Sequence, residues 1–148
     1  MVLRESIWIR TTPEAIFRFF EEMETNYTLW HPGHLSFEWI EGRGVKEGVV
    51  FVFEEKINGK HIKQHVKYTR VVDGRYIEFA PTSRVLRLVL PRMIFRINPE
   101  HNECRFNQEI HVRTGPIGRW LNRKEFDAVK QRMKEEGEQL KSLLEHGM

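Results

Sequence analysis

Three residues in the first half of the chain combine types that could do chemistry: His31, His34 and Glu55. Glu55 falls on the apolar side of a stretch in which apolar and polar residues alternate, between Val49 and Ile57. Burying an unpaired carboxylate is costly, so Glu55 needs a cation, a metal, water or a proton. The two histidines flank a Pro-Gly turn directly ahead of a predicted strand. Glu55 and His34 are therefore the candidate catalytic residues.

The predicted hairpin register brings Glu55 close to the histidines. Asn58 and Gly59 tolerate the positive φ of a type I′ turn, which pairs Ile57 with Lys60 and turns Glu55 inward. The preceding hairpin then places Glu55 opposite position 33, 34 or 35. We expect a Glu55 carboxylate oxygen within about 6 Å of a His31 or His34 ring nitrogen, a distance at which charges perturb one another's pKa.

Three interpretations of this group remain open. His31, His34 and Glu55 could hold zinc or a similar divalent ion, with Gln64, water or substrate as the fourth ligand. Without metal, Glu55 could act as a general acid or base beside His34, while Gln64 and Tyr68 orient the ligand. The third interpretation is structural: the histidines cap a turn and Glu55 is a cavity polar group, since short histidine spacings give many false positives.

The rest of the pattern predicts one domain over residues 1–148, of which 40% are hydrophobic and 30% charged. A short strand over 6–10 is followed by a helix start at Thr12, Pro13 and Glu14. Period-two alternation from Leu35 to Val112 predicts six further strands, one of them Val85 to Ile97 with a break at Pro91. Helical periodicity then predicts a long helix over Leu121 to Glu145.

The predicted fold class is therefore α+β: a curved seven-stranded antiparallel sheet around a long C-terminal helix, with one or two short helices after the first strand. Its apolar inner face and the helix should enclose a pocket of a few hundred Å³, about the usual size for small molecules. Leu35, Leu86, Leu88 and Leu90 are expected on that inner face. The residues predicted to contact a ligand are Trp30, Phe37, Trp39, Phe51, Phe53, Gln64, Tyr68, Phe79, Phe106, Phe126 and Met133.

Charge and composition argue against several classes of function. The net charge of +3 comes from 24 basic and 21 acidic residues mixed along the chain, which is weak evidence for nucleic acid. Basic residues alternate from Lys60 to Lys67; this predicts a solvated face, with an anionic partner as a third functional hypothesis. No apolar run approaches the ~20 residues of a membrane span, and no secretory signal pattern opens the chain, so a cytoplasmic protein is expected.

Other catalytic signatures are missing from the sequence, which has no Gly-rich phosphate loop, Ser-His-Asp order or paired-cysteine zinc spacing. The single cysteine, Cys104, reads as a small buried hydrophobe. A nucleotide enzyme is not indicated, and the expected partner is a small hydrophobic molecule. The oligomeric state stays open.

Five stretches add specific cues to the order of elements: Ser6-Ile7-Trp8-Ile9, Thr11-Thr12-Pro13-Glu14-Ala15-Ile16-Phe17, Asn26-Tyr27, Trp30-His31-Pro32 and Met133-Lys134-Glu135-Glu136-Gly137. With these cues, the order of elements resembles the helix-grip architecture of the START-related lipid-transfer, polyketide cyclase and pathogenesis-related allergen proteins, grouped as SRPBCC. The resemblance covers essentially the whole chain and implies a ligand cavity between helix and sheet. It also extends to diacetylphloroglucinol hydrolases, which use histidine and glutamate ligands to zinc, although this chain lacks their His-x-x-x-Glu pair in the C-terminal helix.

Overall fold

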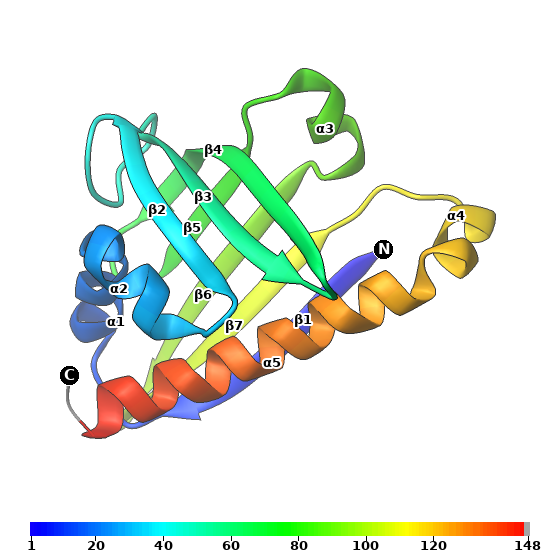
Figure 1. Cartoon of the computed structure of the whole chain (residues 1–148). Coiled ribbons are helices and arrows are strands. Elements are labelled where there is room, and N and C mark those ends of the chain that lie inside the picture. The colour runs from blue at the N-terminus through cyan, green and yellow to red at the C-terminus, as the bar shows by residue number, and fades with distance from the viewer. Residues whose placement is uncertain (147–148) are drawn as a thin grey trace.

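The computed structural model describes residues 1–146 and has the predicted α+β architecture (Figure 1). A seven-stranded antiparallel sheet curves around the long C-terminal helix, and two helices follow the first strand. The elements are β1 (Val2–Ile9), α1 (Pro13–Glu21), α2 (Met23–Trp30), β2 (His34–Glu41), β3 (Val50–Ile57), β4 (Lys60–Val72), β5 (Tyr76–Pro81), α3 (Arg84–Val89), β6 (Arg92–Glu100), β7 (Glu103–His111), α4 (Pro116–Leu121) and α5 (Arg123–His146).

The sheet order is β1-β7-β6-β5-β4-β3-β2, so consecutive strands pair except where β1 closes against β7. The predicted β3–β4 register is confirmed, with Ile57 opposite Lys60 and Glu55 opposite Ile62. Asn58 and Gly59 form its turn with φ of 52° and 75°. Since this register fixes which side chains point inward, it also fixes the orientation of Glu55.

Helix α5 crosses the open face of the sheet and packs mainly on β1 (Figure 1). Its buried residues are Met133, Gly137 and Leu140, from the predicted apolar stripe. A Cβ at Gly137 would lie 3.4 Å from Ile7 Cγ2 and 3.6 Å from Gln108 Nε2, so glycine permits this close approach. The predicted long helix is confirmed, and it begins at Arg123, after the separate short helix α4.

The predicted strand over Val85 to Ile97 is wrong in its first half. Ser83 caps the helix α3 by accepting a hydrogen bond from the Leu86 amide, and the strand β6 begins only at Arg92. Pro91 marks the predicted break. Because the segment is helical and projects from the sheet, Leu86 and Leu88 are exposed rather than on the inner face, while Leu90 packs partly against the core.

Leu35 is also misplaced by the sequence pattern. A register shift between His34 and Ser36 interrupts the β2–β3 pairing, with His34 opposite Glu55 and Ser36 opposite Glu54. The irregularity leaves Leu35 46% exposed and His34 buried at 3%. The histidine therefore takes the inward position that alternation gave to the leucine. Within residues 1–146, no helix is both long and apolar enough to cross a membrane.

Candidate functional site

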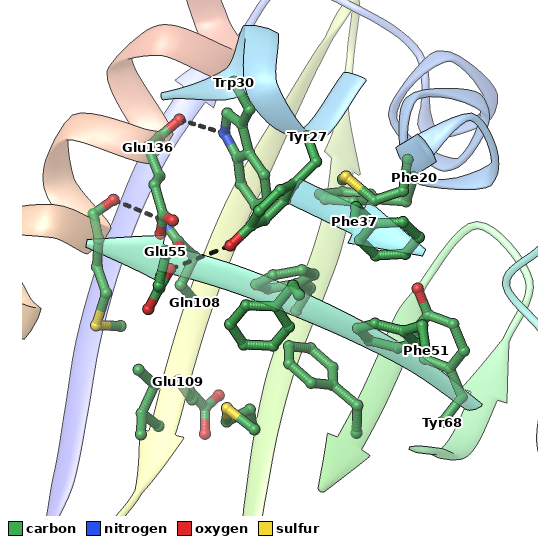
Figure 2. Close-up of a pocket in the computed structure, with 17 residues that line it drawn as sticks. Phe20, Tyr27, Trp30, Phe37, Phe51, Glu55, Tyr68, Gln108, Glu109 and Glu136 are labelled. Carbon is green, nitrogen blue, oxygen red and sulfur yellow. Dashed lines mark hydrogen bonds between the residues drawn. The ribbon is translucent and has the colours of Figure 1, made fainter. Parts of the chain in front are cut away.

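A cavity of about 130 Å³ lies between the inner face of the sheet and the helices α2 and α5. It is smaller than the predicted few hundred Å³ because aromatic side chains from both sides fill much of the space. Figure 2 shows the lining residues converging on it from strands and helices. They are Phe20, Met23, Tyr27, Trp30, Phe37, Phe51, Phe53, Glu55, Tyr68, Phe79, Met93, Phe95, Gln108, Glu109, Ile110, Met133 and Glu136.

The strands β2 to β6 contribute a continuous group of rings to the lining, which we call the aromatic wall. Phe37 stacks on Phe51 with ring centroids 5.0 Å apart, and Phe51 lies 4.9 Å from Tyr68. Phe79 meets Phe95 edge-on at 5.2 Å. Alternate residues of adjacent strands share one face of a sheet, which is why these rings meet. The aromatic wall consists of Phe37, Phe51, Phe53, Tyr68, Phe79 and Phe95.

Four polar side chains gather at one end of the cavity, and we call them the polar end: Tyr27, His34, Glu55 and Glu136. The Glu136 carboxylate oxygen Oε2 lies 2.6 Å from His34 Nε2, and Glu55 Oε2 lies 3.9 Å from the same nitrogen. The Tyr27 hydroxyl donates a hydrogen bond of 3.2 Å to Glu55 (Figure 2). The expected proximity of Glu55 to a histidine is therefore confirmed.

The orientation of the His34 ring is set by its other nitrogen. Nδ1 lies 2.8 Å from the backbone carbonyl of Tyr27, which can only accept, so Nδ1 carries a proton. The Tyr27 ring stacks on the imidazole at 4.0 Å and almost parallel. Nε2 thus points at two carboxylates, and a proton or another cation must lie between it and them.

The supporting contacts tie the polar end to α5. The Trp30 indole Nε1 donates to the Glu136 carbonyl at 2.9 Å. Arg132 lies on the far side of Glu55, with Nη1 3.7 Å from its carboxylate, and a second guanidinium nitrogen donates to the Lys56 carbonyl. Nη1 of Arg132 is buried without a hydrogen bond to any described residue. The arginine therefore adds positive charge next to the polar end.

Burial and charge shift two groups of the polar end. Burial raises the pKa of Glu55, and the nearby Glu136 charge raises it further, against the lowering effects of His34, Arg132 and the Tyr27 hydroxyl. Burial likewise raises the pKa of Tyr27, with the Glu55 and Glu136 charges adding to the effect. Tyr27 therefore stays a hydroxyl donor at any physiological pH. Glu55 holds its proton to a higher pH than an exposed glutamate.

Most residues predicted to contact a ligand do line the cavity: Trp30, Phe37, Phe51, Phe53, Tyr68, Phe79 and Met133. The other four lie outside its lining. Phe106 is fully buried behind Phe20 and Phe95, and Trp39 packs edge-on against Phe37. Gln64 and Phe126 are only partly buried. Whether the lining residues contact a ligand stays a prediction.

Glu136, to which the sequence analysis gave no role, lies where His31 was expected. His31 Nδ1 accepts from the Gly33 amide within the turn, and its Nε2 pairs with Glu135 of α5 at 2.8 Å. The group of three that could hold a metal ion is instead His34, Glu55 and Glu136, whose ligand atoms lie within 4.8 Å of one another. Glu136 was missed, although its position three residues after Met133 puts it beside the buried stripe of α5.

Comparisons with known proteins place the chain in a family. The family model described as polyketide cyclase / dehydrase and lipid transport matches residues 2–145. The chain belongs to this family. No curated protein sequence matches the chain.

Solved structures show the same fold at low sequence identity. The solution structure of the KanY protein aligns with a TM-score of 0.75 at 12% identity, covering 98% of this chain and 97% of that one. A START superfamily protein from Mycobacterium smegmatis gives 0.70 at 12% identity, over 98% and 97% of the two chains. Major latex-like protein 151 from Panax ginseng gives 0.64 at 13%, over 91% and 95%. The helix-grip fold shared by START-related proteins is thereby established for this chain.

Proposed function

We propose that this protein binds a small, largely apolar molecule that carries one polar group, with the apolar part against the aromatic wall and the polar group at the polar end. The observation that carries the proposal is the uneven lining of the cavity. Its wall is aromatic, and the polar side chains of Tyr27, Glu55 and Glu136 project into it together at one end (Figure 2). Sites that combine apolar walls with a few convergent polar groups are typical of small-molecule binding.

The volume favours a compact ligand. A cavity of about 150 Å³ lined by apolar side chains holds a benzene molecule, and the cavity here is about 130 Å³. A single ring or a short acyl segment therefore fits the conformation described. Family membership supports a hydrophobic ligand, since lipid transport and polyketide chemistry both involve such molecules.

The polar end favours a hydroxyl or carbonyl group on the ligand. The raised pKa of Glu55 keeps its proton to a higher pH than in an exposed glutamate, and a protonated carboxyl can donate as well as accept a hydrogen bond. The Tyr27 hydroxyl is held close to it. A ligand without a polar group would leave the remaining hydrogen-bonding capacity of these buried side chains unsatisfied, which costs binding free energy. We therefore expect discrimination between ligands of equal size by one polar atom.

The test compares phenol with toluene as probes, using two-dimensional NMR titration of the purified protein. Phenol should bind about fivefold more tightly than toluene, which corresponds to one net hydrogen bond. Binding should change the NMR chemical shifts of residues that line the cavity. Glu55→Gln should change this preference. Glu54→Gln is the matched control, because Glu54 directly precedes Glu55 in β3 and pairs with His61 on the outer face. Absence of shifts at cavity residues would contradict the proposal.

A second candidate function is catalysis at the polar end, as a cyclase, a dehydrase or a metal-dependent hydrolase. The observation that favours it is His34 Nε2, held by the Tyr27 carbonyl so that it faces two carboxylates. Without metal, Glu55 and His34 would act as an acid–base pair on a ligand in the cavity. With metal, His34, Glu55 and Glu136 would be the ligands, and the Nδ1 hydrogen bond is the kind that orients metal-bound histidines.

The 2.6 Å separation of His34 and Glu136 is that of a shared proton, so a metal would have to displace the proton and move the two side chains apart. Native mass spectrometry after incubation with zinc distinguishes metal-dependent catalysis from metal-free acid–base catalysis. Retention of one ion that is weakened by Glu136→Gln and Glu55→Gln, but not by Glu54→Gln, supports the metal form. No retention leaves the acid–base form, which turnover assays on the same variants test.

A further inference from the structure

Two short helices carry most of the exposed apolar surface. Of the twelve large apolar side chains that are exposed among the described residues, seven belong to α3 and α4. Neither helix has a buried residue, and Val85 and Ile117 are 75% and 76% exposed. Such a concentration is unusual, since exposed apolar residues normally occur singly. The seven are Val85, Leu86, Leu88 and Val89 in α3 and Ile117, Trp120 and Leu121 in α4.

The two helices project from the same end of the sheet (Figure 1). Helix α3 joins the end of β5 to the start of β6, and α4 follows the end of β7, which pairs with the start of β6. A backbone hydrogen bond of 2.8 Å from the Arg113 amide to the Val89 carbonyl links the two segments directly. Residues 82–92 and 112–124 therefore form one surface, which we call the tip.

The charge of the tip has a single sign. Its two segments contain seven basic residues and no acidic residue: Arg84, Arg87, Arg92, Arg113, Arg119, Arg123 and Lys124. Within residues 1–146 none of these seven makes a salt bridge. The Arg123 guanidinium lies over the Trp120 ring at 4.3 Å, so charge and aromatic surface are presented together.

We propose that the tip docks the protein on an anionic lipid bilayer. Exposed Trp, Leu, Ile and Val side chains can enter the boundary between headgroups and acyl chains, while surrounding arginines meet anionic headgroups. A nucleic acid would use the arginines but leave the aliphatic side chains in water. A symmetric contact between two copies would bring the same basic surfaces together, which disfavours a dimer through the tip. The bilayer matches both properties of the tip.

The tip also adjoins the cavity. Leu90, at the end of α3, packs against the core. Met93, three residues later, pairs with Ile110, and both residues line the cavity. The docked protein therefore holds its cavity lining close to the lipid surface. This inference does not depend on the proposed function, since docking is measured without any cavity ligand.

The experiment is vesicle flotation of the full chain, with phosphatidylcholine vesicles and with vesicles containing about 30% phosphatidylserine. Binding is expected to the anionic vesicles and should weaken severalfold as NaCl rises from about 0.1 to 0.5 M. Arg84→Gln with Arg119→Gln should weaken binding by roughly fivefold per residue. Leu88→Ser with Trp120→Ser should weaken it by at least about tenfold, since both apolar anchors are lost.

Two matched controls distinguish the tip from other surfaces. Ile40→Ser with Val72→Ser removes apolar residues that are 47% and 42% exposed elsewhere on the sheet, and vesicle binding should be unchanged. Lys63→Gln with Lys67→Gln removes charges from the basic face of β4, again with binding unchanged. Circular dichroism checks that each variant is folded.

The proposal is overturned if wild type binds no vesicles, if neutral vesicles bind equally, or if the β4 variant loses as much binding as the tip variants. It is also overturned if the tip variants change only the oligomeric state measured by size-exclusion chromatography.

Discussion

The two ends of the cavity are built on different physical principles. The aromatic wall consists of rings on neighbouring strands, in non-directional contact at centroid separations of about 5 Å or more. The polar end joins α2, β2, β3 and α5, and its contacts are directional hydrogen bonds between groups that lie from 7 to 102 residues apart in sequence. The difference suggests that substitutions in the wall chiefly lower stability, whereas substitutions at the polar end chiefly alter protonation and ligand recognition.

The largest expected effect is on the wall. Phe51→Ala removes a ring that is 5% exposed and contacts Phe37 and Tyr68, so it should lower the free energy of unfolding by about 3 kcal/mol. Phe126→Ala, at a partly buried position outside the wall, is the control and should cost much less. Urea denaturation followed by circular dichroism measures both. Equal losses would show that the wall is no more important to stability than the helix surface.

A smaller effect is expected from Tyr27→Phe, which keeps the ring stacked on His34 and removes only the hydroxyl. The hydrogen bond to Glu55 is lost, at a cost of about 1 kcal/mol. Its loss should also raise the pKa of Glu55 further, because the tyrosine donates to the ionised carboxylate. Carboxyl carbon NMR across a pH titration measures this shift.

The matched control for this variant is Tyr76→Phe. Tyr76 donates an equivalent hydrogen bond of 2.7 Å to Glu78, and that pair lies toward solvent. Water can replace the lost donor there, so the loss of stability should be smaller than for Tyr27→Phe. If both variants lose the same stability, then burial does not strengthen the Tyr27–Glu55 contact.

The aromatic wall was more predictable from sequence than the polar end. Its rings lie on neighbouring strands, whereas the polar end also depends on the distant helix α5. Period-two alternation and the Asn58-Gly59 turn fix which side of β3 and β4 faces inward, and so placed Phe51, Phe53 and Tyr68. The pattern failed at Val85 because an apolar run can be either a strand or a short helix, and only the Ser83 cap distinguishes them.

The polar end could be predicted only in part. In the β2–β3 hairpin, inward residues of one strand lie opposite inward residues of the other, and this placed His34 near Glu55. Such pairing is predictable because the two strands are close in sequence. The contribution of Glu136 depends on how α5 packs across the sheet, 102 residues away from His34, and periodicity does not fix that position. The pairing of His31 with Glu135 was equally unpredictable, because Glu135 lies on the same distant helix.

The pH dependence of Glu55 sharpens the comparison further. Its pKa is raised above 4.5 in the folded state, so the folded protein keeps this proton to a higher pH than the unfolded chain does. The stability that Glu55 contributes is therefore fully present below about pH 4.5 and is lost as pH rises through the folded pKa. In metal-free protein, the stability of Glu55→Gln relative to wild type should increase from pH 4 to pH 7. Thermal melts across this range measure the change, with Glu54→Gln as the control.

The smallest expected effect on stability comes from Glu145, a carboxylate whose pKa is lowered rather than raised. Glu145, near the end of α5, accepts a 2.8 Å hydrogen bond from the Arg10 amide and pairs with Lys141 at 2.6 Å. These contacts lower its pKa to about 2. Its stabilising contribution is therefore present above about pH 4.5, the ordinary value, and is lost as pH falls toward 2.

Because Arg10 and Lys141 are substantially exposed, Glu145→Gln should lower the melting temperature at pH 7 by only about 1–2 °C. As pH rises from 3 to 7, the melting temperature of Glu145→Gln relative to wild type should fall, whereas that of Glu55→Gln relative to wild type should rise. Melts of both variants at pH 3, 5 and 7 therefore give opposite slopes. Parallel slopes would mean that Glu55 titrates in the same direction as Glu145, and that burial in the cavity does not hold the proton of Glu55.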